Sequence, residues 1–175
     1  DRQQLEFLSL SEAELTLACG RTGLPAQVYC VLQIGYFKAK HAFFRFTWDD
    51  AQDDCTFVLT RYFDGQTFEP CAITQHEYYA QRTRIAELFG YRAWSADFFP
   101  LLMQQAAPIV QRDVTPGFIV AELMAYLNEH KRVRPGYATL QRLISEALAA
   151  ERRRLGNLLT EVLDATVKNA LAELL

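Results

Sequence analysis

Acidic side chains are the first residues of this sequence to consider for catalysis or metal binding. Asp49, Asp50, Asp53 and Asp54 lie within six positions of one another. They fall at the expected start of a helix, where acidic side chains cap the backbone and complement the helix dipole, so we interpret them as structural rather than as metal ligands. The sequence contains no P-loop, GxGxxG, GxSxG or HExxH pattern. We therefore expect no catalytic residue and no metal site, with a small helical enzyme as a remote alternative.

Cysteine and histidine spacing also argues against a metal centre. No two of the cysteines form a CxxC pair, and the histidines show no ligand spacing to them or to one another. The residues concerned are Cys19, Cys30, Cys55, Cys71, His41, His76 and His130. Each cysteine stands in an apolar stretch, so we expect reduced, buried thiols and a cytoplasmic protein. No apolar run approaches the roughly 20 residues that span a bilayer, so no membrane partner is expected.

Basic residues are concentrated in the second half of the chain, although the formal net charge is −3. Residues 1–80 hold 6 Lys and Arg against 11 Asp and Glu, whereas residues 131–154 hold 7 Lys and Arg against 2 Glu. A local excess of this kind suggests an anionic partner. The alternative is an ordinary solvated helix face.

Helix-start signals and apolar periodicity predict an all-α fold, at least about 60% helical, with two helical subdomains that carry helix-turn-helix-like units. Ser11 and Glu14 form a capping box, and the apolar helix that follows Pro25 is expected to be central to the core. The expected helices cover about 11–20, 25–40, 48–63, 74–89, 95–112 and 116–130, and a long one starts near 138. Whether Gly156 breaks the last helix is open, and 42–46 could form an extended pair with 66–73.

The helix expected over 74–89 is the first candidate for contact with a nucleic acid. Its apolar face is expected to carry Tyr78, Ile85, Leu88 and Phe89. The opposite face carries Gln75, His76, Tyr79 and Thr83, with Arg82 at the border. These side chains suit base edges or phosphates, but the preceding loop is longer than in usual helix-turn-helix units, and a simply solvated face is the alternative.

The second candidate is the basic turn and helix that follow 116–130. Lys131, Arg132 and Arg134 precede the Pro135-Gly136 turn and are expected to grip phosphates. The next helix should bury Leu140, Leu143, Ile144, Ala147 and Leu148. Its outer face combines small and polar side chains that a DNA groove could accept, namely Ala138, Gln141, Arg142, Ser145 and Arg152; Thr139 is a further candidate contact.

Four segments, in order, resemble the N-terminal region of Tn-three-family (replicative transposon) transposases. Residues 132–146 (RVRPGYATLQRLISE) resemble the family's basic turn, proline and Thr-Leu-x-Arg-Leu helix. Residues 84–92 (RIAELFGYR) resemble its EIRELFGYR segment, 31–38 (VLQIGYFK) its core helix, and 10–15 (LSEAEL) its opening helix. The order and spacing agree over roughly 8–155. One departure is at 26–29, where AQVY replaces the family's usual Asn-Arg-Leu-Gly.

The resemblance implies a function and a domain organisation. Relatives bind the terminal inverted repeats of their transposon with this region and cut DNA with a magnesium-dependent domain far downstream. It implies DNA-binding subdomains over 1–94 and 95–156, a helical linker or dimerisation segment over 157–175, double-stranded DNA as partner and a bacterial, nucleoid-associated location. The chain starts without Met, so we expect a segment of a longer protein, without the catalytic domain and with no cofactor of its own.

The alternative within the same family is a helical protein-interaction or dimerisation module. An apolar stripe over 158–174 could pair with a second chain as a homodimer. Its members include Leu159, Val162, Leu163, Thr166 and Ala170.

Overall fold

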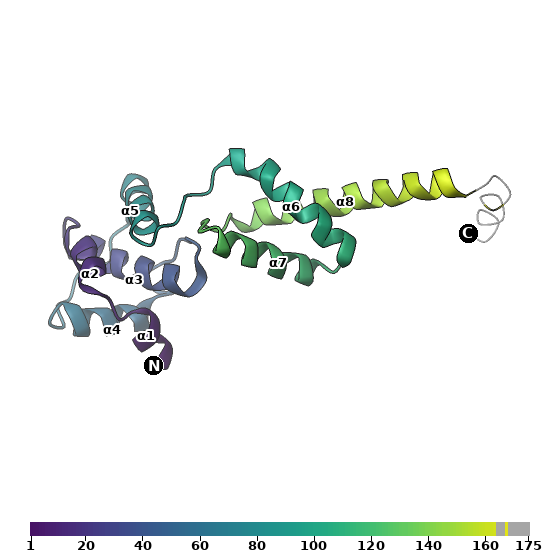
Figure 1. Cartoon of the computed structure of the whole chain (residues 1–175). Helices are drawn as coiled ribbons and strands as arrows, with labels where there is room; N and C mark the ends of the chain where they lie inside the picture. The colour runs from purple at the N-terminus through teal and green to yellow at the C-terminus, as the bar shows by residue number, and fades with distance from the viewer. Residues whose placement is uncertain (164–166, 168–175) are drawn as a thin grey trace. The chain divides into compact units, whose positions relative to one another are not determined.

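The chain is all-α in the computed structural model, which describes residues 1–163 and residue 167 (Figure 1). Helix accounts for 70% of the structure, in agreement with the prediction. The described part holds eight α-helices and no strand, apart from a single bridge between Arg92 and Arg132. The extended pair considered for 42–46 and 66–73 does not form, and both stretches are irregular.

Two compact units make up the described chain. Unit 1 contains 1–94 and the segment 127–134, and unit 2 contains 95–126 and the described residues from 135 onward. The helices of unit 1 are α1 (Arg2–Phe7), α2 (Glu12–Cys19), α3 (Leu24–Lys40), α4 (Gln52–Tyr62) and α5 (Gln75–Leu88). α1 was not predicted, and α4 starts four residues later than expected because 48–50 form a turn.

Side-chain caps define the starts of α2 and α5. The Ser11 hydroxyl accepts a hydrogen bond from the amide of Glu14 (3.3 Å), and the Glu14 carboxylate accepts one from the amide of Ser11 (2.8 Å), which confirms the predicted capping box. Thr74 accepts from the amide of Glu77 (3.2 Å) at α5. Glu77 does not complete a capping box at this helix, because its carboxylate is engaged by Arg21 and by the side chain of Gln81.

α3 is the central helix of unit 1, as its apolar sequence predicts. Every side of it is covered: residues 28–35 are all buried, and so is Phe37. α1, α2, α4 and α5 all pack against α3, which lies between α4 and α5 in Figure 1. A helix that is apolar all round must be enclosed in this way, because each exposed side would leave apolar area in water.

The segment 127–134 completes unit 1. Val133 is 1% exposed within the core, and its amide donates to the carbonyl of Arg92 (3.0 Å), whose own amide donates to the carbonyl of Lys131 (2.8 Å). The Arg134 amide donates to the carbonyl of His41 (3.1 Å). From the sequence, this segment was expected to belong with 95–156. Helical periodicity shows that Val133 is apolar, but it does not show which of the two cores Val133 enters.

Unit 2 consists of a 3₁₀ turn (Ala96–Phe98), α6 (Phe99–Arg112), α7 (Pro116–Glu129, whose last residues belong to unit 1) and α8 (Tyr137–Val162). α8 packs mainly against α6. Pro100 lies in the first turn of α6, and Pro108 lies inside α6 without ending it. α8 continues through Gly156 without interruption, which settles the open question about this residue.

Gly35 permits the close approach of α3 to the residues just after α1. A Cβ at this position would collide with the Leu8 side chain and would lie 3.2 Å from the carbonyl oxygen of Phe7. Gly35→Ala should lower the free energy of unfolding by about 1–3 kcal/mol, although Ala is the better helix former. Urea denaturation followed by circular dichroism measures this change.

Gly156→Ala is the matched control, because a Cβ at this helical glycine meets nothing within 4 Å. It should leave the free energy of unfolding unchanged or raise it by up to about 1 kcal/mol. Equal effects of the two substitutions would contradict the proposed close contact at Gly35.

Candidate nucleic-acid interface

The outer face of α5 presents four of its five candidate contact residues to solvent. Gln75, His76, Tyr79 and Thr83 are exposed, with Tyr79 at 50%. The face that packs toward α3 differs from the prediction: Tyr78 and Ile85 are buried as expected, but Leu88 is 39% exposed. Gln81 and Ala86 take the remaining buried positions. A polar Gln81 was missed because it is buried through hydrogen bonds to Glu77 (3.0 Å) and to the carbonyl of Ala26 (3.2 Å), which periodicity does not reveal.

Arg82, the candidate at the border of this face, is half-buried among aromatic rings. Its Cζ lies 5.1 Å from the ring centroid of Phe43, 5.3 Å from that of Tyr78 and 5.5 Å from that of Tyr79. These contacts are cation–π interactions, which hold the guanidinium in place without using its N–H groups. A hollow of about 190 Å³ adjoins it; its lining includes Phe43, Tyr79, Arg82, Thr83, Trp94 and Val133.

The basic turn lies in unit 1, with α5, whereas α8 belongs to unit 2. Lys131 is exposed, and its Nζ lies 5.0 Å from the ring centroid of Tyr91. Arg132 and Arg134 are half-buried, and Arg134 Nε is buried without a hydrogen-bond partner. The backbone of this turn anchors the segment to unit 1, a role that the sequence analysis did not foresee. Its contact with phosphates stays a prediction.

His41 is a titratable residue that the sequence analysis considered only as a metal ligand. It has left-handed backbone geometry (φ 50°) at the end of α3, and its ring stacks on Tyr91 with centroids 5.3 Å apart. Its Nδ1 is buried without a hydrogen-bond partner. Burial lowers the pKa of His41, and the nearby charges of Arg134 and Lys131 lower it further. His41 is therefore neutral at pH 7.

The predicted outer face of α8 is open to solvent. Ala138, Gln141, Arg142, Ser145 and Arg152 are exposed, and Thr139 is half-buried. On the inner face, Leu143, Ile144 and Ala147 are buried, while Leu140 and Leu148 are only half-buried. The prediction of a buried inner face is thus confirmed for three of the five α8 residues, and the other two are partly exposed.

Arg142 is the best-supported side chain of the α8 face. Its Cζ lies 4.3 Å from the ring centroid of Phe99 on α6, and its Nε lies 3.7 Å from the Glu146 carboxylate. The side chain is nevertheless 62% exposed. Stacking on one face leaves the planar edge of the guanidinium available to a ligand.

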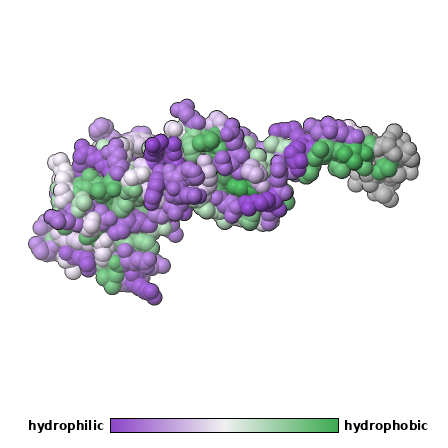
Figure 2. All heavy atoms as spheres, viewed as in Figure 1, coloured by the Kyte–Doolittle hydropathy of each residue, from purple (hydrophilic) through white to green (hydrophobic). Residues whose placement is uncertain are grey.

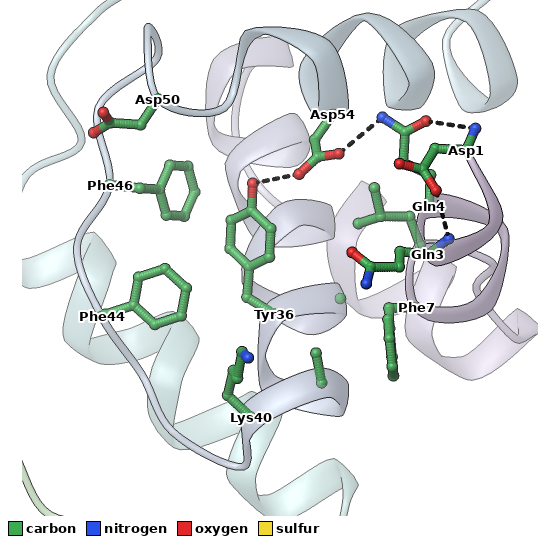
Figure 3. Close-up of a pocket in the computed structure, with 13 residues that line it drawn as sticks. Asp1, Gln3, Gln4, Phe7, Tyr36, Lys40, Phe44, Phe46, Asp50 and Asp54 are labelled. Atoms are coloured by element: carbon green, nitrogen blue, oxygen red, sulfur yellow. Dashed lines mark hydrogen bonds between the residues drawn. The ribbon is translucent and has the colours of Figure 1, made fainter.

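Two residues of the aspartate cluster, Asp50 and Asp54, accept hydrogen bonds, and Figure 3 shows those of Asp54. Asp54 accepts from the Tyr36 hydroxyl (2.8 Å) and from the Gln4 side chain (2.9 Å), in a hollow of about 560 Å³. Burial, followed by the interactions with Asp54, raises the pKa of Tyr36 above its usual range. Asp50 accepts from the hydroxyl (2.7 Å) and the amide (3.0 Å) of Thr47, which lowers its pKa. Within residues 1–163 and 167, no group of three or more His, Cys, Asp or Glu side chains is placed to hold a metal ion.

The four cysteines are free thiols, but only some of them are buried. Cys30 on α3 is buried, and burial raises its pKa to about 12. Cys55 is half-buried, whereas Cys19 and Cys71 are exposed. The expectation of buried thiols was wrong for these last two, because Cys19 ends a short surface helix and Cys71 lies in an irregular loop.

A family model described as "Domain of unknown function (DUF4158)" matches residues 1–147. The chain belongs to this family. The match includes all of unit 1, α6 and the part of α8 that carries Arg142, and it ends before Arg152. No curated protein matches the chain. None of the described helices of this DUF4158 chain has both the length and the apolar character needed to cross a membrane.

We expect the partly buried His41 of the DUF4158 domain to make the stability of the domain depend on pH. Because the pKa of His41 is lower in the folded state than the usual value near 6.5, the unfolded chain binds the proton more tightly. The free energy of unfolding is therefore not reduced by His41 above about pH 6.5, where its ring is neutral in both states. Below that pH it decreases as the pH falls toward the folded-state pKa, because the unfolded chain takes up the proton first. His41→Asn, which tolerates the left-handed backbone, should reduce this slope in urea denaturation between neutral and mildly acidic pH.

His76→Asn on the exposed face of α5 is the control, and it should keep the pH slope of the parent protein. An unchanged slope in His41→Asn would show that the protonation of His41 does not govern acid stability.

Proposed function

We propose that this DUF4158 chain binds duplex DNA and, as the N-terminal part of a replicative transposase, recognises the terminal inverted repeats of a transposon. The observation that carries the proposal is the exposed face of α8. Gln141, Ser145 and Arg152 project within about 40° of one another around the helix axis, with Arg142 beside them. An α-helix with such a face fits the major groove, where Gln and Arg read base edges.

The charges of α8 also favour contact with DNA. Glu146 pairs with Arg142, and Glu151 accepts two hydrogen bonds from Arg154 (2.6 and 2.7 Å). Arg152 and Arg153 are exposed and form no ion pair within the part of the chain that the structure describes. Between residues 137 and 154, both acidic side chains are thus paired locally, and basic groups are left over for phosphates.

The resemblance to Tn-three-family transposases supports the proposal independently. The four resembling segments fall on α2, on α3, on the end of α5 with Tyr91, and on the basic turn with the start of α8. The last segment includes Gln141, Arg142 and Ser145 of the α8 face, whereas the exposed residues Gln75, His76 and Tyr79 of α5 lie before the third segment. In the proposed protein, magnesium serves the downstream catalytic domain, and this chain binds DNA without a cofactor and without cleaving it.

The experiment is a selection from a randomised duplex library, followed by fluorescence anisotropy on an enriched duplex and on a scrambled version of it. Enrichment of one sequence, bound much more tightly than its scrambled control, would support the proposal. Failure to enrich any sequence, with no binding at low salt, would refute it.

Arg142→Ala and Lys131→Ala should affect binding differently. Arg142→Ala should cost about 1–3 kcal/mol on the enriched duplex and much less on the scrambled one, because a base contact is lost. Lys131→Ala should weaken binding to both duplexes equally and lower the salt slope by about one unit, because a phosphate contact is lost. Equal losses on both duplexes for Arg142→Ala would rule out groove reading by this residue, even if DNA binding stands.

Self-association through the second half of α8 is a second proposed property. Leu155, Leu158, Leu159 and Val162 are between 41% and 79% exposed, and Figure 2 shows apolar side chains gathered there. Leu148, Leu155 and Val162 repeat every seven residues, the spacing by which like helices pair in coiled coils. Leu163 is half-buried, and Thr166 and Ala170 lie outside the described residues. We propose a homodimer formed by this stripe.

Leu159→Glu should shift the protein toward the monomer, because a charge would be buried in the paired stripe. Sedimentation velocity over a range of concentrations measures this shift. Leu5→Glu on the exposed side of α1 is the matched control and should leave association unchanged. A parent protein that stays monomeric at high concentration would refute the dimer.

A further inference from the structure

Two arginines of unit 1 lie against one aromatic ring. Arg45, in the loop before α4, has its Cζ 5.0 Å from the ring centroid of Tyr78. Arg82, on α5, has its Cζ 5.3 Å from the same centroid. The two positive charges are therefore held within about 10 Å of each other, although 37 positions separate the residues in the sequence.

Neither guanidinium has an acidic partner. Within the described residues, Arg45 and Arg82 make no ion pair and no side-chain hydrogen bond, and their contacts are with aromatic rings. Glu77, the acid of α5 that precedes Tyr78, is occupied by Arg21 (3.7 Å) and by the Gln81 side chain (3.0 Å). Two positive charges are therefore left without compensation on this surface.

The rings hold the arginines in a fixed arrangement. Tyr78 is 6% exposed, and Phe43 and Phe46 in the loop that carries Arg45 pack against the core of unit 1. A guanidinium that stacks by its face keeps its N–H edges free, and these edges match the oxygens of a phosphate. Little side-chain entropy would be lost on binding, because the stacking already restricts both residues.

We propose that Arg45 and Arg82 form a phosphate clamp that grips the backbone of duplex DNA. This inference rests on the proposed DNA-binding function and adds a contact that the sequence analysis did not include, Arg45. For Arg82, where both base edges and phosphates were considered from the sequence, it specifies contact with the backbone. The Arg82 side chain is half-buried against Phe43 and Tyr78. It can therefore contact a phosphate at the DNA surface more easily than a base edge inside a groove. Duplex DNA carries several phosphates within about 10 Å, enough to engage both arginines.

The test compares Arg45→Ala and Arg82→Ala with Arg61→Ala. Arg61 is the matched control, because it is also exposed and stacked on rings, those of Phe57 (5.8 Å) and Tyr62 (5.7 Å), but belongs to α4. Each clamp variant should weaken binding to the enriched and scrambled duplexes alike, by about three- to tenfold, and lower the salt slope by about one unit. Arg61→Ala should change neither quantity.

Lysine variants address folding and geometry. Arg45→Lys and Arg82→Lys keep the charge but lose the planar fork, so each should retain the salt slope while binding more weakly than the parent. Thermal unfolding by circular dichroism identifies any variant that is not folded. Should Arg82→Ala fail to fold, Arg45→Ala still tests the clamp, because Arg45 is exposed in a loop. Parent-like binding by Arg45→Ala, or a loss confined to the enriched duplex, would overturn the clamp.

A titration with inorganic phosphate separates the clamp from the DNA proposal. In nitrogen-15 NMR spectra, saturable shifts of the Nε–Hε signals of Arg45 and Arg82, absent for Arg61, would support the anion site. If these shifts occur but no duplex binds, the proposed function fails and the anion site stands. If duplexes bind tightly while Arg45→Ala has no effect, the clamp fails and the proposed function stands.

Discussion

The complete burial of α3 is the constraint on which the rest of unit 1 depends. Because this helix is apolar on all sides, four other helices must cover it, and the aromatic residues of the 43–48 loop pack against the same core. The glycine at position 35 lets the chain around Leu8 approach closely enough to be one of these covers. One face of α5 packs against α3, and the opposite face of α5 is therefore left exposed to solvent.

Cationic side chains resting on aromatic rings recur on the candidate interface. Arg82 lies against three rings, Lys131 against Tyr91 and Arg142 against Phe99. Stacking on a ring orients a positive group without neutralising it; of the three, Arg142 also pairs with Glu146. On each unit, such side chains suit an anionic polymer, whose phosphates accept hydrogen bonds from the free N–H edges.

The proposed DNA contacts fall on both units. α5 and the basic turn belong to unit 1, and the face around Arg142 belongs to unit 2. The second half of α8 carries Arg152, Arg153 and Arg154 and, after them, the exposed side chains of Leu155, Leu158, Leu159 and Val162. DNA binding is proposed for α8 as far as Arg152, and self-association mainly for residues 155–162.

The sequence alone determined the helical class, most helix boundaries, the cap at Ser11, the central position of α3 and the exposed face of α8. These properties follow from local spacing, because capping and amphipathic periodicity act over a few residues. Only the tertiary structure decided that 127–134 joins unit 1 and that Gln81 is buried. It also decided that Arg45 and Arg82 contact the same ring, that of Tyr78, and that the charges of Lys131 and Arg134 lie near His41. Each of these depends on residues far apart in the chain, whose meeting is set by how the helices pack and not by any pattern within a single helix.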